Sequence, residues 1–207
     1  MEATVGRTSR GRHVSVKAAS EADVPEVVET LAQAFDAVPI FRWFLPDASR
    51  RANILPAFFA AMVESHLPWG QIFRWADGSA AAVWVPPGAH MPAAQAAELE
   101  ERLPAVVGEY GARMRELRPL LEPWRPTVPH WYLHFLAVRP AAQGRGRGSA
   151  LLRTVLDRCD ADGIPAYLDA TSEDNKRLYE RHNFVVRQRV TLRDSPPLWC
   201  MLREAPG

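Results

Sequence analysis

Apolar residues in the first part of the chain follow two different periods. The segment "EADVPEVVETLAQAFDA" (residues 21–37) repeats apolar residues at three- and four-residue intervals, which predicts an amphipathic helix. Ser20, three residues before Asp23, supplies an N-cap pattern at its start. The preceding segment "HVSVKAA" (13–19) alternates apolar and polar residues, which predicts a strand.

The following segments predict a helix, a loop and a hairpin. A helix is expected over residues 49–66, bent near Pro56, whereas the proline-punctuated aromatic segment 38–47 predicts a loop or short turn. The segment "QIFRWADGSAAAVWVPP" (71–87) has two apolar runs around Asp77-Gly78, which predicts a β-hairpin. Residues 92–122 are expected to be helical, with interruptions at Pro104, Gly108, Gly111 and Pro119.

The second half of the chain alternates strand and helix patterns. "HWYLHFLAV" (130–138) has apolar residues on both faces, as in a buried central strand. Two helices and three strands are expected after it: helix 149–163 closed by Gly163, strand 165–170, helix 172–183, and strands 184–194 and 198–204. This order predicts an α/β fold, a mixed sheet with helices on its faces. The length suits one domain over residues 14–207, after a frayed tail over residues 1–13.

Composition narrows the functions that this chain could have. A formal net charge of +1 gives no global field for a polyanion, so nucleic acid is not expected as a partner. The longest mostly apolar run, residues 54–63, is too short to span a membrane. Cys159 and Cys200 lie far apart, which favours neither a disulfide framework nor a zinc site. A reducing compartment, the cytoplasm, is therefore expected.

A glycine-rich junction follows the central strand, in "VRPAAQGRGRGSALL" (138–152). Glycines between a strand and a helix let the backbone approach an anion, and the free N–H groups at the helix start point toward it. Here the segment Gly144–Ser149 would supply the N–H groups, with charge-assisted contacts from Arg145 and Arg147. No Gly-Lys-Ser/Thr follows, and no acidic residue completes a dinucleotide fingerprint. A turn without a ligand and an RNA contact stay as alternatives.

Two motifs at this separation resemble the GNAT acetyltransferase superfamily. The first is Gln143-x-x-Gly146-x-Gly148 after a strand that ends at Val138, and the second is "LDATSEDNKRLYERHNF" (168–184). Within the superfamily, "TLAQAFDAVP", "LLEPWRP", "IPAYLDATS" and "LWCMLR" resemble the puromycin N-acetyltransferases, in the same order over nearly the whole chain. Asn183 stands where that family usually has glycine, and Phe41–Leu45 differs in detail. The resemblance implies a GNAT fold and transfer of acetyl from acetyl-CoA to a small primary amine, such as an aminonucleoside.

The resemblance also implies roles for individual residues. Backbone groups at the end of the central strand would pair with the pantetheine arm, and the Val138 N–H would donate to the thioester oxygen. Tyr179 would be the general acid that protonates the leaving thiolate, unless it is a core tyrosine. Asn175 would hold the pantetheine or a water, unless it only caps a helix. The acetyl-CoA contacts expected are Leu136, Ala137, Val138, Gln143, Gly144, Arg145, Gly146, Arg147, Gly148, Ser149, Asn175 and Tyr179.

The base and the acceptor site are expected on the face of the central strand. Many superfamily members carry a carboxylate there, and this chain has none. A period of two puts Tyr132, His134 and Leu136 on one face. His134, whose ordinary pKa is near 6.5, is the candidate base, with a core histidine as the alternative. The residues expected to bind the acceptor in a lidded aromatic pocket are Phe35, Trp43, Phe44 and Tyr132.

The expected partners are therefore acetyl-CoA and a small-molecule amine, with no metal, and either a monomer or a homodimer would suit this chemistry. Two alternatives stay open. One is the same chemistry on a protein or peptide amine, and the other is a non-catalytic domain that binds acyl-CoA.

Overall fold

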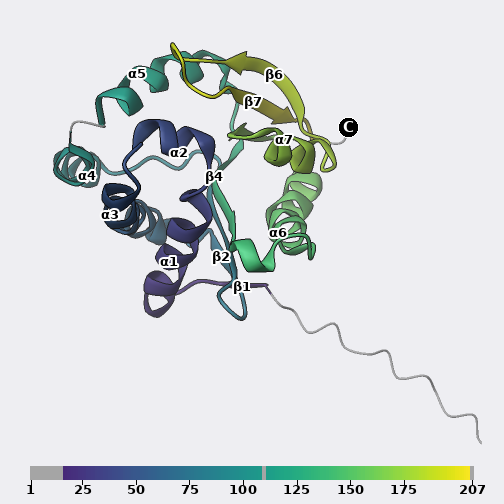
Figure 1. Ribbon diagram of the computed structural model, residues 1–207. Helices are drawn as coiled ribbons and strands as arrows, with labels where there is room; N and C mark the ends of the chain where they lie inside the picture. The colour runs from purple at the N-terminus through teal and green to yellow at the C-terminus, as the bar shows by residue number, and fades with distance from the viewer. Residues whose placement is uncertain (1–15, 109–110, 206–207) are drawn as a thin grey trace, which may run out of the picture.

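A single mixed sheet organises the part of the chain that the computed structural model describes, residues 16–108 and 111–205 (Figure 1). Its strand order is β1-β2-β3-β4-β5-β7-β6. Only the central pair β4–β5 is parallel among the pairings in this region, and the others are antiparallel. The strands are β1 (Val16–Ala18), β2 (Ile72–Trp75), β3 (Ala80–Val85), β4 (Trp131–Val138), β5 (Ala166–Ala170), β6 (Val185–Val190) and β7 (Leu198–Arg203). The predicted mixed sheet is confirmed.

Helices cover both faces of this sheet. Helices α1 to α5 lie on one side, and α6 and α7 lie on the other (Figure 1). Their bounds are α1 (Val24–Phe35), α2 (Pro39–Phe44), α3 (Ala48–His66), α4 (Ala93–Val107), α5 (Gly111–Leu121), α6 (Arg147–Asp162) and α7 (Glu173–Glu180). In the described part of the chain, no helix combines the length and the apolar character needed to cross a membrane.

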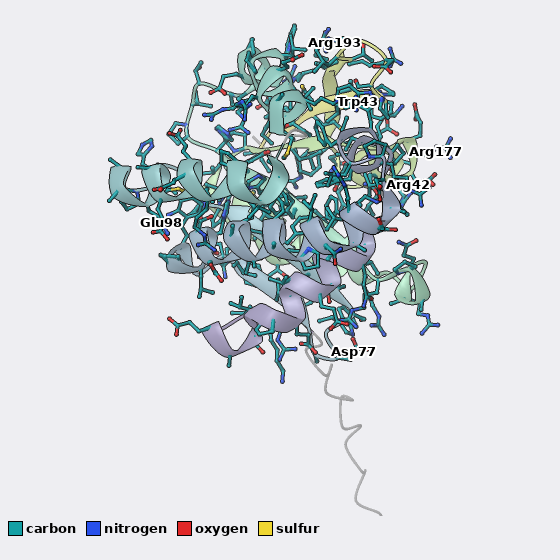
Figure 2. All side chains as sticks on the ribbon, turned by 60° about the vertical axis from the view of Figure 1, so that its left-hand side comes forward. Arg42, Trp43, Asp77, Glu98, Arg177 and Arg193 are labelled. Carbon is teal, nitrogen blue, oxygen red and sulfur yellow. The ribbon has the colours of Figure 1, made fainter. Side chains whose placement is uncertain are left out.

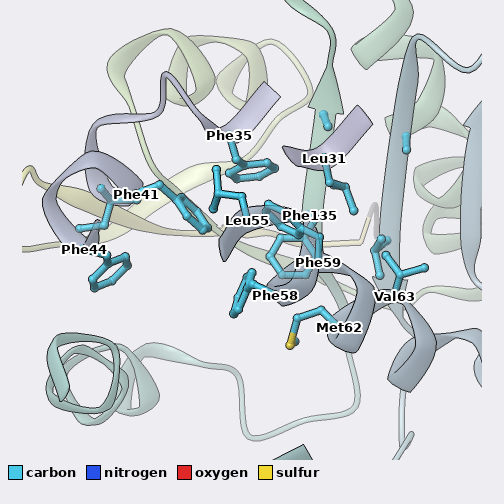
Figure 3. Packing of buried hydrophobic residues seen from close by; sticks show 14 of the residues in the cluster. Leu31, Phe35, Phe41, Phe44, Leu55, Phe58, Phe59, Met62, Val63 and Phe135 are labelled. Carbon is cyan, nitrogen blue, oxygen red and sulfur yellow. The ribbon is translucent and has the colours of Figure 1, made fainter. Parts of the chain in front are cut away.

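Each face of the sheet has its own apolar core. On the α1–α5 side, phenylalanine rings meet mostly edge to face, with centroids 5.0 to 6.1 Å apart. Figure 3 shows these rings packed between the helices and Phe135 of β4. On the α6–α7 side, fully buried leucines of α6 pack against Trp84 of β3. Burying each such side chain stabilises the fold by about 1.5–3 kcal/mol.

The predicted loop over residues 38–47 is wrong, because residues Pro39–Phe44 form helix α2. Pro39 occupies the first turn, where its missing N–H and fixed φ are favourable. Ile40, Phe41 and Phe44 have helical spacing and are all buried. The helical spacing of the buried apolar residues therefore determines the structure here, and the flanking prolines do not prevent the helix.

The interrupted helical stretch also differs from expectation. Pro104 and Pro119 lie inside α4 and α5 and do not end them, whereas Gly108, with φ +55°, ends α4. Leu103 and Val107 of α4 pack into the α1–α5 core, which compensates for the helix hydrogen bond lost at Pro104.

Other turns follow the sequence closely. The predicted hairpin is confirmed as β2 and β3, and Gly78 in its turn has φ +69°. Gly163 ends α6 with φ +66°, and Asn183 adopts φ +65°, the left-handed geometry that asparagine tolerates. The tail expected over residues 1–13 lies outside the described residues.

Candidate active site

The central strands β4 and β5 separate along their length. Their parallel pairing runs from Trp131–Ala166 to Leu133–Leu168, and β4 continues beyond it to Val138. On its other edge β4 stays paired with β3 as far as Val138, opposite Ala80. The second half of β4 therefore exposes one backbone edge that β5 does not cover.

The alternation of backbone groups decides which amides face that open edge. The Arg139 N–H donates to the Ser79 carbonyl at 2.8 Å, so this antiparallel pair is hydrogen bonded. The next pair, Val138 and Ala80, is then of the non-hydrogen-bonded kind, and the Val138 N–H and C=O face away from β3. The same alternation turns Leu136 outward and Ala137 toward β3. Leu136 and Val138 therefore offer their backbone at the open edge, and Ala137 does not.

A bulge in β4 changes which side chains share a face. Val83 pairs with Phe135 and Trp84 with Leu133, so His134 is an extra residue in the strand. Phe135 consequently packs on the α1–α5 side together with Tyr132. Leu136 packs on the α6–α7 side, so the expectation that it shares a face with Tyr132 and His134 is wrong.

The glycine loop lies next to the open edge. A short 3-10 helix (Pro140–Ala142) leads from β4 into the loop, and Gly146 is the N-cap of α6. Gly144 has φ +72° and Gly146 has φ +75°, conformations that other residues adopt only with strain. The Gln143 side chain donates to the Val138 carbonyl at 3.1 Å, which ties the loop to the strand end.

One cavity of about 590 Å³ connects the loop, the strand edge and helix α7. It also reaches the segment between α1 and α2, so it touches elements from both sides of the sheet. Of the expected site residues, those that line it are Phe35, Leu136, Val138, Gln143, Gly144, Gly146, Arg147, Gly148, Ser149, Asn175 and Tyr179. Residues that sequence reasoning missed are Ala34, Ala37, Val38, Pro39, Ala142, Ser172, Asp174, Leu178 and Arg181.

Some expected contacts are not among the described residues that line this cavity. Ala137 is buried in the α1–α5 core, and Arg145 is exposed to solvent. Arg147 does line the cavity, but its guanidinium is paired with Asp77 at 2.9 Å and lies over the Trp75 ring. Its charge is thus largely balanced by the carboxylate of the hairpin turn. An anion bound here would meet the loop amides and the start of α6, together with Arg181, which also lines the cavity.

Tyr179 and Asn175 line the cavity from one face of α7. Tyr179 is 6% exposed, and burial raises the pKa of its phenol well above the ordinary value. The phenol is therefore protonated at neutral pH and can act as a proton donor. The Asn175 amide donates to the Thr171 hydroxyl at 3.3 Å, and its backbone N–H donates to the Ser172 hydroxyl, which is the N-cap contact of α7.

A group of ionisable and hydroxyl side chains gathers on the α1–α5 side of the sheet, and we refer to it as the polar cluster. Tyr132 and Tyr167 both donate to the Asp169 carboxylate, at 3.4 and 2.8 Å. The Arg125 guanidinium lies over the Tyr132 ring, 4.3 Å from its centroid. The polar cluster consists of His66, Arg125, Tyr132, His134, Tyr167 and Asp169.

The polar cluster is deep in the protein and yet partly accessible. Burial is the first cause that raises the pKa values of Tyr132 and Asp169 and lowers that of His134 well below its ordinary value. Even so, all three residues keep intermediate exposure. His134 itself is separated from the cavity by Phe135, on which its ring stacks at 4.1 Å, and by Phe35.

The aromatic residues expected to bind an acceptor have different surroundings. Phe35 lines the cavity, whereas Phe44 is buried in the core against Phe41 (Figure 3). Trp43 lies at the outer end of α2, where its indole N–H donates to Asp194 at 3.1 Å and Arg113 lies over its ring. Figure 2 shows Trp43 and Arg193 at one end of the molecule, far from Asp77 beside the glycine loop. Trp43 and Phe44 thus support the fold around the site and are not among its described lining residues.

Comparisons with known proteins agree with this arrangement. The sequence model of the acetyltransferase (GNAT) family matches residues 62–184, more than half of the chain. An uncharacterized N-acetyltransferase of Schizosaccharomyces pombe is 26% identical over 206 residues, which cover 92% of this chain and 83% of that protein.

Two solved structures are similar over most of the chain. The Corynebacterium glutamicum protein named "histone acetyltransferase HPA2 and related acetyltransferase" has a TM-score of 0.71 and 28% identity, covering 93% of this chain and 97% of that one. Arylalkylamine N-acetyltransferase 2 of Aedes aegypti has the same fold, with a TM-score of 0.65 and 14% identity, covering 92% and 98%. The family match begins in α3 and ends after α7, so it includes β4, the glycine loop and Tyr179.

Proposed function

The chain belongs to the GNAT family of acetyltransferases, and we propose that it transfers the acetyl group of acetyl-CoA to the primary amine of a small molecule. Its family and relatives make it an N-acetyltransferase, and the GNAT fold implies acetyl-CoA as the co-substrate. The observation that carries the proposal is the cavity that runs from the glycine loop along the open edge of β4 to Tyr179 and the α1–α2 segment. Both substrates can meet there in one complex, so transfer is direct.

The cavity has the chemistry that acetyl-CoA requires. The amides of the loop and the positive end of the α6 dipole suit the pyrophosphate. Leu136, Val138 and Leu178 give the cavity an apolar wall for the pantetheine arm. The outward N–H and C=O of Leu136 can pair with its amides as an added strand would, whereas the Val138 carbonyl already accepts from the Gln143 side chain.

Charge that develops during transfer needs donors that are already in place. When the amine attacks, the thioester oxygen becomes negative, and we assign the Val138 N–H as its donor. This amide faces the open edge and belongs to a strand fixed by β3, so little reorganisation is needed. The Tyr179 phenol then gives its proton to the leaving thiolate. Asn175, on the same face of α7, would orient the pantetheine or a water.

The amine nitrogen must lose a proton as its bond to the carbonyl carbon forms, and His134 is our proposed acceptor of that proton through bridging water, because His134 is not among the described residues that line the cavity. His134 is neutral throughout the neutral and mildly acidic range, because burial and the nearby His66 and Arg125 lower its pKa. The acid limb of the rate profile due to this base should therefore lie below the ordinary histidine value. His134→Ala should lower kcat/KM by about 100-fold near neutrality.

A small acceptor fits the surroundings of the cavity. Phe35, Val38 and Pro39 close it on the side away from the cofactor loop, and an apolar wall of this kind suits a compact, partly aromatic amine. An aminonucleoside such as puromycin is the acceptor we propose, on the resemblance of the sequence motifs. A protein amine is the rival, since the name of the Corynebacterium glutamicum relative includes histone acetyltransferase.

Thiol release from acetyl-CoA tests these alternatives together. The purified chain is assayed with puromycin, an arylalkylamine, agmatine and a lysine-containing peptide, and Tyr179→Phe serves as the control for enzyme-dependent release. We expect kcat/KM for a small amine to exceed that for the peptide. A clear preference for the peptide would contradict the proposed acceptor class. Tight acetyl-CoA binding without release on any amine would indicate a non-catalytic domain.

A further inference from the structure

The polar cluster contains a histidine that the mechanism above does not use. His66 is the last residue of α3 and is 3% exposed, against the face of β4 that carries His134. Its Nε2 lies 2.8 Å from His134 Nδ1, and the two ring centroids are 4.8 Å apart. The ring of Trp69 meets His66 edge-on at 4.8 Å, and Phe135 stacks on His134 at 4.1 Å. Packing therefore holds both imidazoles in place.

The surroundings of His66 determine which of its nitrogens carries the proton. Its Nδ1 lies 2.7 Å from the Met62 carbonyl oxygen, and a carbonyl oxygen can only accept. Nδ1 must therefore carry a hydrogen. The Ser65 hydroxyl donates to the same carbonyl at 2.8 Å, and its oxygen is 3.0 Å from Nδ1. Burial lowers the pKa of His66 to about 4, so the ring is neutral at neutral pH and its Nε2 carries a lone pair that can accept a hydrogen bond.

The tautomer of His134 follows from that of His66. Two lone pairs 2.8 Å apart would repel, so His134 Nδ1 must donate its hydrogen to His66 Nε2. The neutral His134 ring then carries its lone pair on Nε2. None of the described residues forms a hydrogen bond with this nitrogen, and the residue keeps partial exposure. His134 Nε2 is thus the nitrogen of the two rings that can still accept a proton, because no group of the described residues is bonded to it.

We propose that His66 is a positioning residue: it donates from Nδ1 to the Met62 carbonyl and accepts at Nε2 from His134. This contact fixes His134 as the Nδ1–H tautomer and leaves its Nε2 free to accept the proton of the acceptor amine. This inference rests on the proposed function, because it gives His134 a task only if acetyl transfer occurs. In the step itself, the N–H bond of the attacking amine breaks, the proton passes through bridging water, and an N–H bond to His134 Nε2 forms. The imidazolium keeps its Nδ1–H bond to neutral His66, and later releases the Nε2 proton to solvent.

The tautomer can be measured without any activity. Long-range ¹H–¹⁵N correlation spectra of the ¹⁵N-labelled full chain at neutral pH distinguish Nδ1–H from Nε2–H imidazoles. We expect both His66 and His134 to be Nδ1–H in the wild type. In His66→Leu, which removes the acceptor from a similar volume, His134 should shift toward the Nε2–H form, and kcat should fall about tenfold or more. The KM for acetyl-CoA should not change.

Ser65→Ala is the matched control, because it alters the same helix end but leaves the Met62 carbonyl and both imidazoles. It should keep the wild-type tautomers and kcat. Nε2–H at His134 in an active wild type would overturn the role of His66, and this result needs no variant to fold. Unchanged kcat in a folded His66→Leu would also overturn it. A wild type that is Nδ1–H at His134 but acetylates no amine would instead refute the proposed function and, with it, the role of His134.

Discussion

The glycine loop and the polar cluster lie on opposite sides of the same strand and are built in opposite ways. The loop and the strand end before it, Val138–Ser149, are consecutive in the sequence, and in the proposed mechanism they contribute mainly backbone amides. The polar cluster brings together side chains from α3, β4 and β5 and the side chain of Arg125. Two of its hydrogen-bonded residues, His66 and His134, are 68 positions apart in the sequence. Side-chain identity and protonation state decide what it can do.

This difference separates what each region contributes to the reaction. Backbone amides have no protonation state near neutral pH, so the loop should bind its anion equally well across that range. The polar cluster contains groups whose pKa values burial has moved, and its properties should depend on pH and on single side chains. Tyr179 shares features of both regions, since it lines the cavity with the loop, and its proposed role depends on its proton.

The largest expected effect is a loss of acetyl-CoA affinity when the backbone geometry of the glycine loop is changed. Gly146→Asp forces a side chain into a left-handed conformation, at a cost of about 1–2 kcal/mol, and adds a negative charge where phosphate is expected. The affinity for acetyl-CoA, measured by calorimetry, should fall by about 100-fold or more. Gly163→Asp is the control, because it puts the same side chain at a left-handed glycine with open space around it, at the other end of α6 and outside the cavity lining. Equal losses in both variants would contradict a role for loop geometry.

Tyr179→Phe tests the residue that shares features of both regions. The ring and its contact with Phe184 are kept, and only the proton donor is removed. We expect kcat to fall by about 100-fold, the usual scale for a lost general acid, while the affinity for acetyl-CoA changes little. Full turnover in this variant would make Tyr179 a packing residue of the core.

The smallest effect concerns stability and belongs to the polar cluster. The folded-state pKa of His66 is lowered to about 4, so the unfolded chain binds a proton first as the pH falls from about 6.5. The His66 contribution to stability is present above pH 6.5 and is lost on acidification toward pH 4, with a change of about 2 kcal/mol between pH 7 and pH 5. Urea denaturation of wild type and His66→Gln at these two pH values measures it. The variant should show a smaller loss, and equal losses would contradict a buried neutral His66.

The same contrast explains how much the sequence could predict. The glycine loop, the hairpin turn and the α6 stop were predictable because each depends on a few adjacent residues. Asn183 and the order of strands and helices in the second half also followed from local patterns.

What failed depends on packing between distant segments. The bulge at His134 arises from the pairing of β4 with β3, and a strict period of two therefore placed Leu136 on the wrong face. His66 and Asp169 gave no local signal, because their partners come from other elements. A prediction of buried histidine pairs would have needed the contact between α3 and β4.

The central claim is that the open edge of β4 receives the acetyl-CoA thioester, and hydrogen exchange at single amides tests it most directly. Exchange is followed by NMR on the full chain with and without acetyl-CoA. The Val138 amide, which faces the open edge, should become strongly protected when acetyl-CoA binds. The Arg139 amide, already bonded to the Ser79 carbonyl, should change little and serves as the internal control. Tight binding of acetyl-CoA with no added protection at Val138 would contradict the account.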